Sequence, residues 1–222
     1  MKQTRKFDGR AKVLDAAEYL FSKEGYHGVS LRQVAELAGV ELGALTHHFP
    51  SKDQLFSETL RRRFDELSQD RMRLLDDARI RADGRSPTID EIISAYVEPV
   101  IRRNAESQEW RNYSRLLSRD ISDANVSAIL ADVKEPTSSH FVSAFRMALP
   151  GAPAEDVYWG YQFMRSALLG ITAETGWIDR LSRGLCRSDD IEGAARRMIP
   201  FLGAGFARLL ADRSPQASSG AA

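Results

Sequence analysis

The stretch SLRQVAELAGVELGALTHHFPSK, residues 30–52, decides the fold of this chain. It begins with Ser30, followed three residues later by glutamine, which is the spacing of a helix capping box. Apolar residues recur at helical spacing until Gly39, a residue that readily adopts the left-handed conformation that ends a helix. A second short helix is predicted over 41–49, and Pro50 ends it. Two short helices joined by a glycine turn are typical of a helix-turn-helix, although such pairs also occur in other all-α proteins.

Outward from this stretch, the chain is predicted to be helical almost throughout. Apolar residues at intervals of three and four predict a helix over 9–25. A second capping box at Ser51 opens a long helix over 51–81, which at 1.5 Å per residue is a rod of about 45 Å. No strand-like alternation of useful length is found, so the fold class is all-α. Further helices are predicted at 88–106, 107–121, 126–133, 136–149, 154–175 and 189–211.

These elements divide the chain into three parts. Residues 1–50 are predicted to form an N-terminal three-helix, helix-turn-helix DNA-binding domain. The long helix from 51 joins it, without a flexible linker, to a helical-bundle domain that spans 51–213. The small, polar tail at 214–222 is expected to be disordered. Because the rod leaves directly from the helix-turn-helix, we expect motion in the second domain to be transmitted mechanically to the first.

Composition narrows the functional classes. The 222 residues are 43% hydrophobic and 28% charged, near globular averages, which excludes disorder for most of the chain. Acidic and basic residues number 31 each, which excludes a surface that is positively charged throughout but not a local basic patch. A single cysteine, Cys186, excludes an intrachain disulfide. No apolar run reaches 18 residues and no signal core follows the basic start, so we expect a cytoplasmic protein without a membrane span.

No catalytic or metal-binding constellation stands out. His47 and His48 are adjacent, so on a helix they point about 100° apart and do not easily share a metal ion. No glycine-rich phosphate loop occurs, and nothing in the sequence activates the Cys186 thiol, so a buried or incidental cysteine is expected. We therefore expect no catalytic residues, metal or cofactor. The alternative is a small-molecule-binding or enzymatic all-α protein that retains a helix-turn-helix head.

Three segments, in order within the first quarter of the chain, resemble the TetR (tetracycline-repressor) family of bacterial regulators. ALTHHFPSKDQLF at 44–56 resembles the family's tLYhHFpsKeeLf, and VSLRQVAELAGV at 29–40 resembles tTlrdIAerAGV. VLDAAEYLFSKEG at 13–25 resembles the first-helix pattern ILDAAxxLFxxxG. The resemblance implies a homodimeric transcriptional regulator, a repressor that a small apolar or amphipathic effector releases from double-stranded operator DNA.

The resemblance also implies a set of DNA-binding residues: Ser30, Arg32, Glu41, Leu42, Gly43, Thr46, His47, His48 and Lys52. Arg32 matches a position that reads guanine in some members, and arginine suits the O6 and N7 atoms of that base. Lys52 matches a phosphate contact near a helix N-terminus. Two alternatives stay open for Glu41, which either accepts a hydrogen bond from a cytosine amino group or pairs with Arg32.

Two of these positions depart from the family pattern. Position 46 is often tyrosine in the family and is Thr46 here, and position 42 is often polar and is Leu42 here, where it could meet a thymine methyl group. These departures leave the operator sequence open. Ala44, Leu45 and Phe49 are expected to pack inward.

The first twelve residues carry five basic side chains against one acidic side chain. Such an arm could follow the DNA backbone or enter a minor groove, as arms of other folds do. The alternative, a solvated and disordered start, stays open.

Aromatic residues concentrate after the rod, over 88–177. A helical core accounts for most of them, but in the TetR family the helices after the rod enclose an apolar effector pocket. The candidate lining residues are Trp110, Tyr113, Leu117, Phe141, Phe145, Trp159 and Phe163. A loose likeness to members that sense fatty acids or their acyl-CoA thioesters implies an effector of that class.

Two late segments, 160–176 and 193–211, are dense in glycine, alanine and leucine, which favours close helix packing. An outward apolar stripe on both would form a four-helix dimer interface, as the family usually does. The candidate interface residues are Ala167, Leu168, Ile171, Met198, Leu202 and Phe206. The alternative is that both stripes face the core of their own domain.

Overall fold

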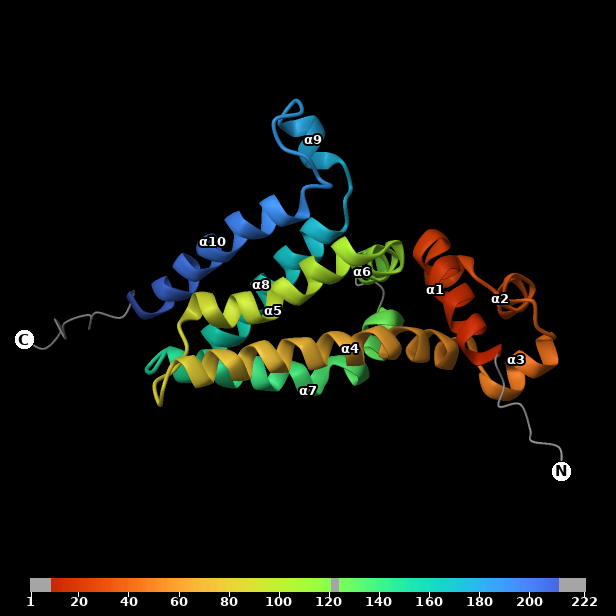
Figure 1. Ribbon diagram of the computed structural model, residues 1–222, viewed down its shortest axis with the longest axis horizontal. Coiled ribbons are helices and arrows are strands. Elements are labelled where there is room, and N and C mark those ends of the chain that lie inside the picture. Colours follow the sequence, from red (N-terminus) through yellow and green to blue (C-terminus); the bar gives the residue numbers. More distant parts are fainter. Residues whose placement is uncertain (1–8, 121–123, 212–222) are drawn as a thin grey trace, which may run out of the picture.

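The computed structural model describes residues 9–120 and 124–211, and within these ranges it contains helices and no strand, so the all-α class is confirmed (Figure 1). The elements follow the chain as α1 (Gly9–Gly28), α2 (Leu31–Ala38), α3 (Leu42–His48), α4 (Lys52–Arg81), α5 (Ile89–Glu106), α6 (Gln108–Asp120), α7 (Ala124–Ala148), α8 (Ala154–Thr172), α9 (Trp177–Leu181) and α10 (Ile191–Ala211).

Helices α1 to α3 form a small unit at one end of the molecule, which we call the head (Figure 1). The helix cap and the helix-ending glycine predicted from the sequence are both present in the head. Ser30 and the glutamine three residues later make both bonds of the capping box at the start of α2. Gly39 ends α2 with a φ of 65°, and Gly25 interrupts α1 with a φ of 73°, values that favour glycine. These breaks separate the helices that pack on one another in the head.

Helix α4 leaves the head and runs along the remaining helices, which we call the body (Figure 1). It is continuous over 30 residues, as predicted, and begins where the Ser51 hydroxyl oxygen accepts a hydrogen bond from the Gln54 amide at 3.1 Å. Its apolar stripe, which includes Leu67 and Leu75, is buried against the body. One helix therefore belongs to both parts, and no flexible segment separates them.

The structure differs from the predicted elements in two places. The break expected between 133 and 136 is wrong, because α7 runs unbroken from Ala124 to Ala148 and packs along α4 and α8. Tertiary packing here overrides a local helix-breaking signal. The region near Gly184, expected to be a connection, contains the five-residue helix α9, and its Trp177 is 59% exposed rather than part of the core.

Most of the basic arm, residues 1–8, and the tail at 214–222 lie outside the described residues. No described helix combines the length and the apolar character needed to cross a membrane.

Candidate DNA-binding surface and effector cavity

Helix α3 presents one face to the core of the head and the other to solvent. Leu45 and, directly after the helix, Phe49 are buried, so the opposite face of α3 points outward. Seven of the nine residues expected to contact DNA are exposed: Ser30, Arg32, Glu41, Leu42, Gly43, His47 and His48. They lie on the first turn of α2 and along α3, which is the arrangement that a groove-reading helix requires.

The other two, Thr46 and Lys52, are half-buried and already bonded inside the protein. The Thr46 hydroxyl lies 3.1 Å from the Leu42 carbonyl oxygen, to which it donates. The Lys52 ammonium donates to the Val29 carbonyl at 3.0 Å and lies 4.4 Å from the centre of the Tyr26 ring. Lys52 thus fastens the loop between α1 and α2 to the start of α4, a role that the sequence did not reveal. An ammonium has three donors, so two remain for a phosphate.

Glu41 and Arg32 do not form the ion pair that was one of the two alternatives for Glu41. Within the described residues, neither side chain takes part in a salt bridge or a hydrogen bond with another side chain. Both charged groups are exposed and stand at the edge of the head, Glu41 as the N-cap of α3 and Arg32 in the first turn of α2.

We expect Arg32→Ala to weaken binding to the cognate operator by about 1–3 kcal/mol and to relax the base preference at one position. Because the Arg32 guanidinium is exposed, the fold of the head should be unchanged. Competition titrations against operator variants and random DNA measure the effect, with Arg180→Ala on α9 as a control for the lost charge. An equal loss on specific and random DNA would show that Arg32 contacts the backbone and reads no base.

A buried carboxylate joins the head to α4. Glu18 of α1 is 2% exposed and receives hydrogen bonds from Arg62 at 2.7 Å and from Arg63 at 3.0 Å. Arg62 also bonds Asp15 at 2.7 Å. Burial by itself lowers the pKa of Arg62, but the bonds and charges of Glu18 and Asp15 outweigh it and raise that pKa above its ordinary value. Two cations of α4 are therefore held by one acid of the head.

Trp110, which was expected to line an effector pocket, lies at this joint and is not among the described residues around the cavity of the body. It is 5% exposed, on α6, which packs against α1. The guanidinium carbons of Arg63 and Arg103 lie 5.0 and 5.1 Å from the Trp110 ring. Tyr113, one turn further along α6 and 5.8 Å from Trp110 between ring centres, does line the cavity. The Trp110 side chain is therefore in contact with Arg63 of α4 and Arg103 of α5.

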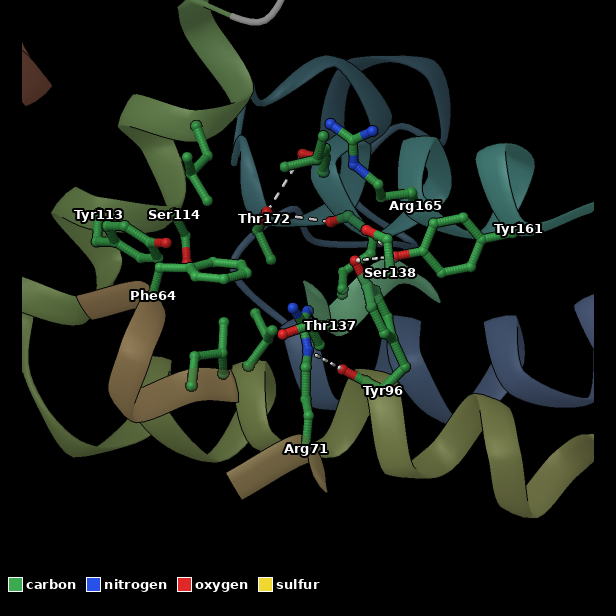
Figure 2. Close-up of a pocket in the computed structure, with 15 residues that line it drawn as sticks. Phe64, Arg71, Tyr96, Tyr113, Ser114, Thr137, Ser138, Tyr161, Arg165 and Thr172 are labelled. Atoms are coloured by element: carbon green, nitrogen blue, oxygen red, sulfur yellow. Dashed lines mark hydrogen bonds between the residues drawn. The ribbon is translucent and has the colours of Figure 1, made fainter. Parts of the chain in front are cut away.

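The body encloses a small cavity of about 40 Å³, with residues of α4 to α8 around it (Figure 2). Of the expected lining residues, Tyr113 and Leu117 are in its wall. Sequence reasoning missed several of its polar members, among them Arg71, Tyr96, Thr137, Ser138 and Tyr161. One signal was available for Arg71, because it lies at helical spacing from Phe64, Leu67 and Leu75 and so occupies the apolar stripe of α4.

The remaining expected pocket residues lie elsewhere. Phe141 is fully buried in the core, and its ring meets Tyr96 edge to face at 5.1 Å. Phe145 is also fully buried and stacks on Phe206 at 4.3 Å. Trp159 and Phe163 are more than half exposed on α8. Spacing along one helix therefore identified the buried faces of α6 and α7, but it predicted neither the exposure of Trp159 and Phe163 nor which buried face borders the cavity.

The expected interface residues mostly face their own domain, which was the alternative interpretation. Leu168 lines the cavity, while Met198, Leu202 and Phe206 are at least 91% buried within the chain. Ala167 and Ile171 are half-buried. Where α8 crosses α10, a Cβ atom at Gly160 would come within 2.5 Å of the Phe206 ring, so the small residues serve this close contact within the chain.

The outward side of the same two helices carries three exposed aromatic side chains. Trp159, Phe163 and Phe201 are 55%, 59% and 78% exposed, and the rings of Trp159 and Phe163 stack at 5.9 Å. A shallow groove runs between α8 and α10, with Trp159, Phe163 and Gly205 in its wall. We call Trp159, Phe163 and Phe201 the outer stripe.

Other reactive groups do not form a site among residues 9–120 and 124–211. Cys186 is free and exposed rather than buried, and no cluster of three or more His, Cys, Asp or Glu side chains is placed to hold a metal ion in these ranges.

Two family models match the chain in the order in which the head and the body occur. Residues 13–59 match the model described as "Bacterial regulatory proteins, tetR family". Residues 94–205, about half of the chain, match "Tetracyclin repressor-like, C-terminal domain".

Individual relatives agree with these matches. The chain is 31% identical over 144 residues to the HTH-type transcriptional repressor KstR of Rhodococcus jostii (strain RHA1), which is 56% of this chain and 68% of KstR. It is 43% identical over 65 residues to the HTH-type transcriptional regulator RutR of Escherichia coli (strain K12), 29% of this chain and 31% of RutR. The structure of the fatty acid degradation regulator FadR from Bacillus halodurans has the same fold, with a TM-score of 0.63 at 15% identity, covering 91% of this chain and 98% of FadR.

Proposed function

We propose a mechanism from one premise, which is that this chain belongs to the TetR family of transcriptional regulators. It is accordingly a ligand-responsive, DNA-binding regulator. We infer that it is a repressor, as KstR is named, and that an effector bound in the body releases it from its operator. The observation that carries the proposal is the exposed face of α3, held outward by buried Leu45 and Phe49 and connected by α4 to the cavity.

In this proposal residues 1–50 bind DNA, and residues 51–213 bind the effector and dimerise. Arg32 and the exposed residues of α3 contact the bases, while His48 and Lys52 contact phosphates. A helix-turn-helix dimer places two recognition helices in successive major grooves, about 34–36 Å apart for one helical turn. The seven-residue α3 is too short to reach two half-sites alone, so dimerisation supplies the second.

We place the dimer interface on the outer stripe rather than on the residues expected from sequence. Trp159, Phe163 and Phe201 are exposed within one chain and lie on α8 and α10, the two helices that the family uses for this purpose. Apolar patches of this kind on a protein surface mark contact sites. A second copy packed on this face would bury all three side chains in a four-helix arrangement.

The coupling between cavity and head runs through α6 and α4. Tyr113 borders the cavity, and Trp110, one turn away on the same helix, contacts Arg63, which in turn bonds Glu18 of the head. An effector that displaces α6 therefore changes the contacts that orient the head. The effector shifts the population toward conformers with another spacing of the recognition helices, by no more than its differential affinity for the two states.

We propose that the effector is a small amphipathic molecule, with a fatty acid or an acyl-CoA as candidates. The apolar side chains of Phe64, Leu67 and Leu117 in the cavity support an apolar body. The name of FadR, a fatty acid degradation regulator of the same fold, supports this class without assigning it to this chain.

An electrophoretic shift with DNA from upstream of the protein's own gene tests the proposed function. We expect specific binding by the full chain, a loss of affinity as salt rises, and release by effector co-purified from the native host. Binding no tighter than to random DNA would refute the regulator. Chemical conversion of the released ligand would favour the alternative, an enzymatic all-α protein with a helix-turn-helix head, because a regulator returns its ligand unchanged.

A further inference from the structure

Arg71 differs from the other charged side chains that the body and head bury. The described residues bury three: Glu18, Asp70 and Arg71. Glu18 is held by two arginines, and Asp70 is held by Arg73 and by two arginines of α5 at 2.8–2.9 Å. Burial alone would raise the pKa of Asp70, but the two arginines of α5, Arg103 and Arg102, hold that pKa below its ordinary value. Both buried acids are therefore charge-compensated inside the protein.

Among the residues that the structure describes, no acid compensates the charge of Arg71. It is 5% exposed, its Nε donates to the Tyr96 carbonyl oxygen at 2.9 Å, and its guanidinium carbon lies 3.6 Å from the centre of the Tyr96 ring. Within the described residues no carboxylate pairs with it. An arginine cannot lose its proton in a protein, and a buried, unpaired charge is costly. The two terminal nitrogens of the guanidinium point into the cavity (Figure 2).

The surroundings of the cavity favour negative charge. Among the residues that the structure describes, fifteen line the cavity, and they include two arginines, Arg71 and Arg165, and no aspartate or glutamate. Within the described part of the chain, the buried Tyr113 hydroxyl has no hydrogen-bond partner, and the Tyr161 hydroxyl reaches only the Ser138 hydroxyl and, at 3.4 Å, that of Tyr96. Burial raises the pKa of Tyr113 far above its ordinary value, against the opposing charge of Arg71, so this phenol stays a neutral donor.

We propose that the cavity binds the carboxylate of an otherwise apolar effector and that Arg71 is the residue that binds it. This inference rests on the proposed role of the cavity as the effector site. The planar guanidinium matches a carboxylate through two parallel hydrogen bonds. A buried phenol beside it supplies a further donor. The remaining wall, which includes Phe64, Leu67 and Val100, is apolar and suits the body of the molecule.

The size of the cavity is consistent with binding the carboxylate of the effector. A volume of about 40 Å³ is roughly three water-sized spheres, enough for the three heavy atoms of a carboxylate. The apolar body of the effector must part the lining side chains, Tyr113 among them, and this displacement is the movement that the coupling to the head requires. Of the two candidate classes, a free acid presents its carboxylate at this end, whereas an acyl thioester has none there. The geometry therefore favours the free acid.

The test compares acids with their neutral amides on the full-length protein. We choose acetate, benzoate and octanoate against acetamide, benzamide and octanamide, at constant ionic strength, with thermal unfolding and calorimetric titration as readouts. We expect at least one acid to stabilise the wild type while its amide does not. In Arg71→Gln the affinity for that acid should fall about 10- to 150-fold, the range for hydrogen bonds to a charged group, and Arg71→Lys should recover part of it.

A matched control is Arg79→Gln, on the same helix, where the arginine pairs with Asp76 on the surface and should leave acid binding unchanged. Three results would each overturn the assignment: no acid of the panel stabilises the wild type, the amides bind as tightly as the acids, or Arg71→Gln keeps the preference for acids. If Arg71→Gln does not fold, the assignment is tested by the affinity of Arg71→Lys for the acid and by the ratio of acid to amide affinity in the wild type. Operator binding is measured separately. A protein that binds the acids but no operator refutes only the proposed function as a DNA-binding regulator. A protein that binds its operator but none of the acids refutes only the carboxylate assignment.

Discussion

Glu18→Ala should lower the free energy of unfolding by about 3 kcal/mol, because it removes the acid that compensates two cations at the joint. Arg62 and Arg63 are only 25% and 16% exposed, so water cannot fully replace the carboxylate. The head should also lose its fixed orientation on α4, and operator affinity should fall further than stability alone explains. Chemical denaturation and DNA titration at a temperature where the variant is folded measure the two effects.

The matched control is Glu58→Ala. Glu58 also links head and rod, through Arg10 at 2.8 Å, but that pair is largely exposed, with side chains 35% and 52% accessible. Exposed pairs contribute about 1 kcal/mol or less. If the two variants lose equal stability and equal DNA affinity, the buried cluster at Glu18 has no special role in holding the head.

Phe163→Asp should convert the protein to a monomer that keeps its helical content. Phe163 is 59% exposed within one chain, so an aspartate there is solvated in the monomer. In the proposed interface the same aspartate is an unpaired charge in an apolar contact, which is strongly unfavourable. With one head per molecule, operator affinity should fall on the order of 100-fold or more, since the two heads no longer act together. Sedimentation and circular dichroism provide the readouts.

Two further variants make this test specific. Ile80→Asp, at a 76% exposed position near the end of α4, alters an exposed apolar residue outside the outer stripe and should leave the dimer intact. Phe206→Asp should instead unfold the body, because Phe206 is 3% exposed and stacks on Phe145. A Phe163→Asp protein that remains dimeric would move the interface to another surface.

The head and the rod could be predicted because their signals are local. A capping box at Ser30, the positive φ of Gly39 and the cap at Ser51 each act within one turn of the chain, where neighbouring residues determine the conformation. The all-α class follows from the spacing of apolar residues, which reports the face of each helix that is buried. The family resemblance implied that Ala44, Leu45 and Phe49 pack inward, and in the structure Leu45 and Phe49 are buried while Ala44 is half-buried.

What covers each buried face depended on packing between helices that are distant in the sequence. Trp110 and Tyr113 share an apolar face of α6, yet one contacts arginines at the joint and the other borders the cavity. Helix α8 carries two apolar faces, and its packing against α6, α7 and α10 buries one of them and leaves Phe163 exposed. The isolation of Arg71 could not be read from the sequence either, because an arginine is compensated or unpaired according to which acids the fold brings within about 4 Å. Periodicity describes a helix about its own axis, whereas a site is defined by the neighbours that the tertiary structure supplies.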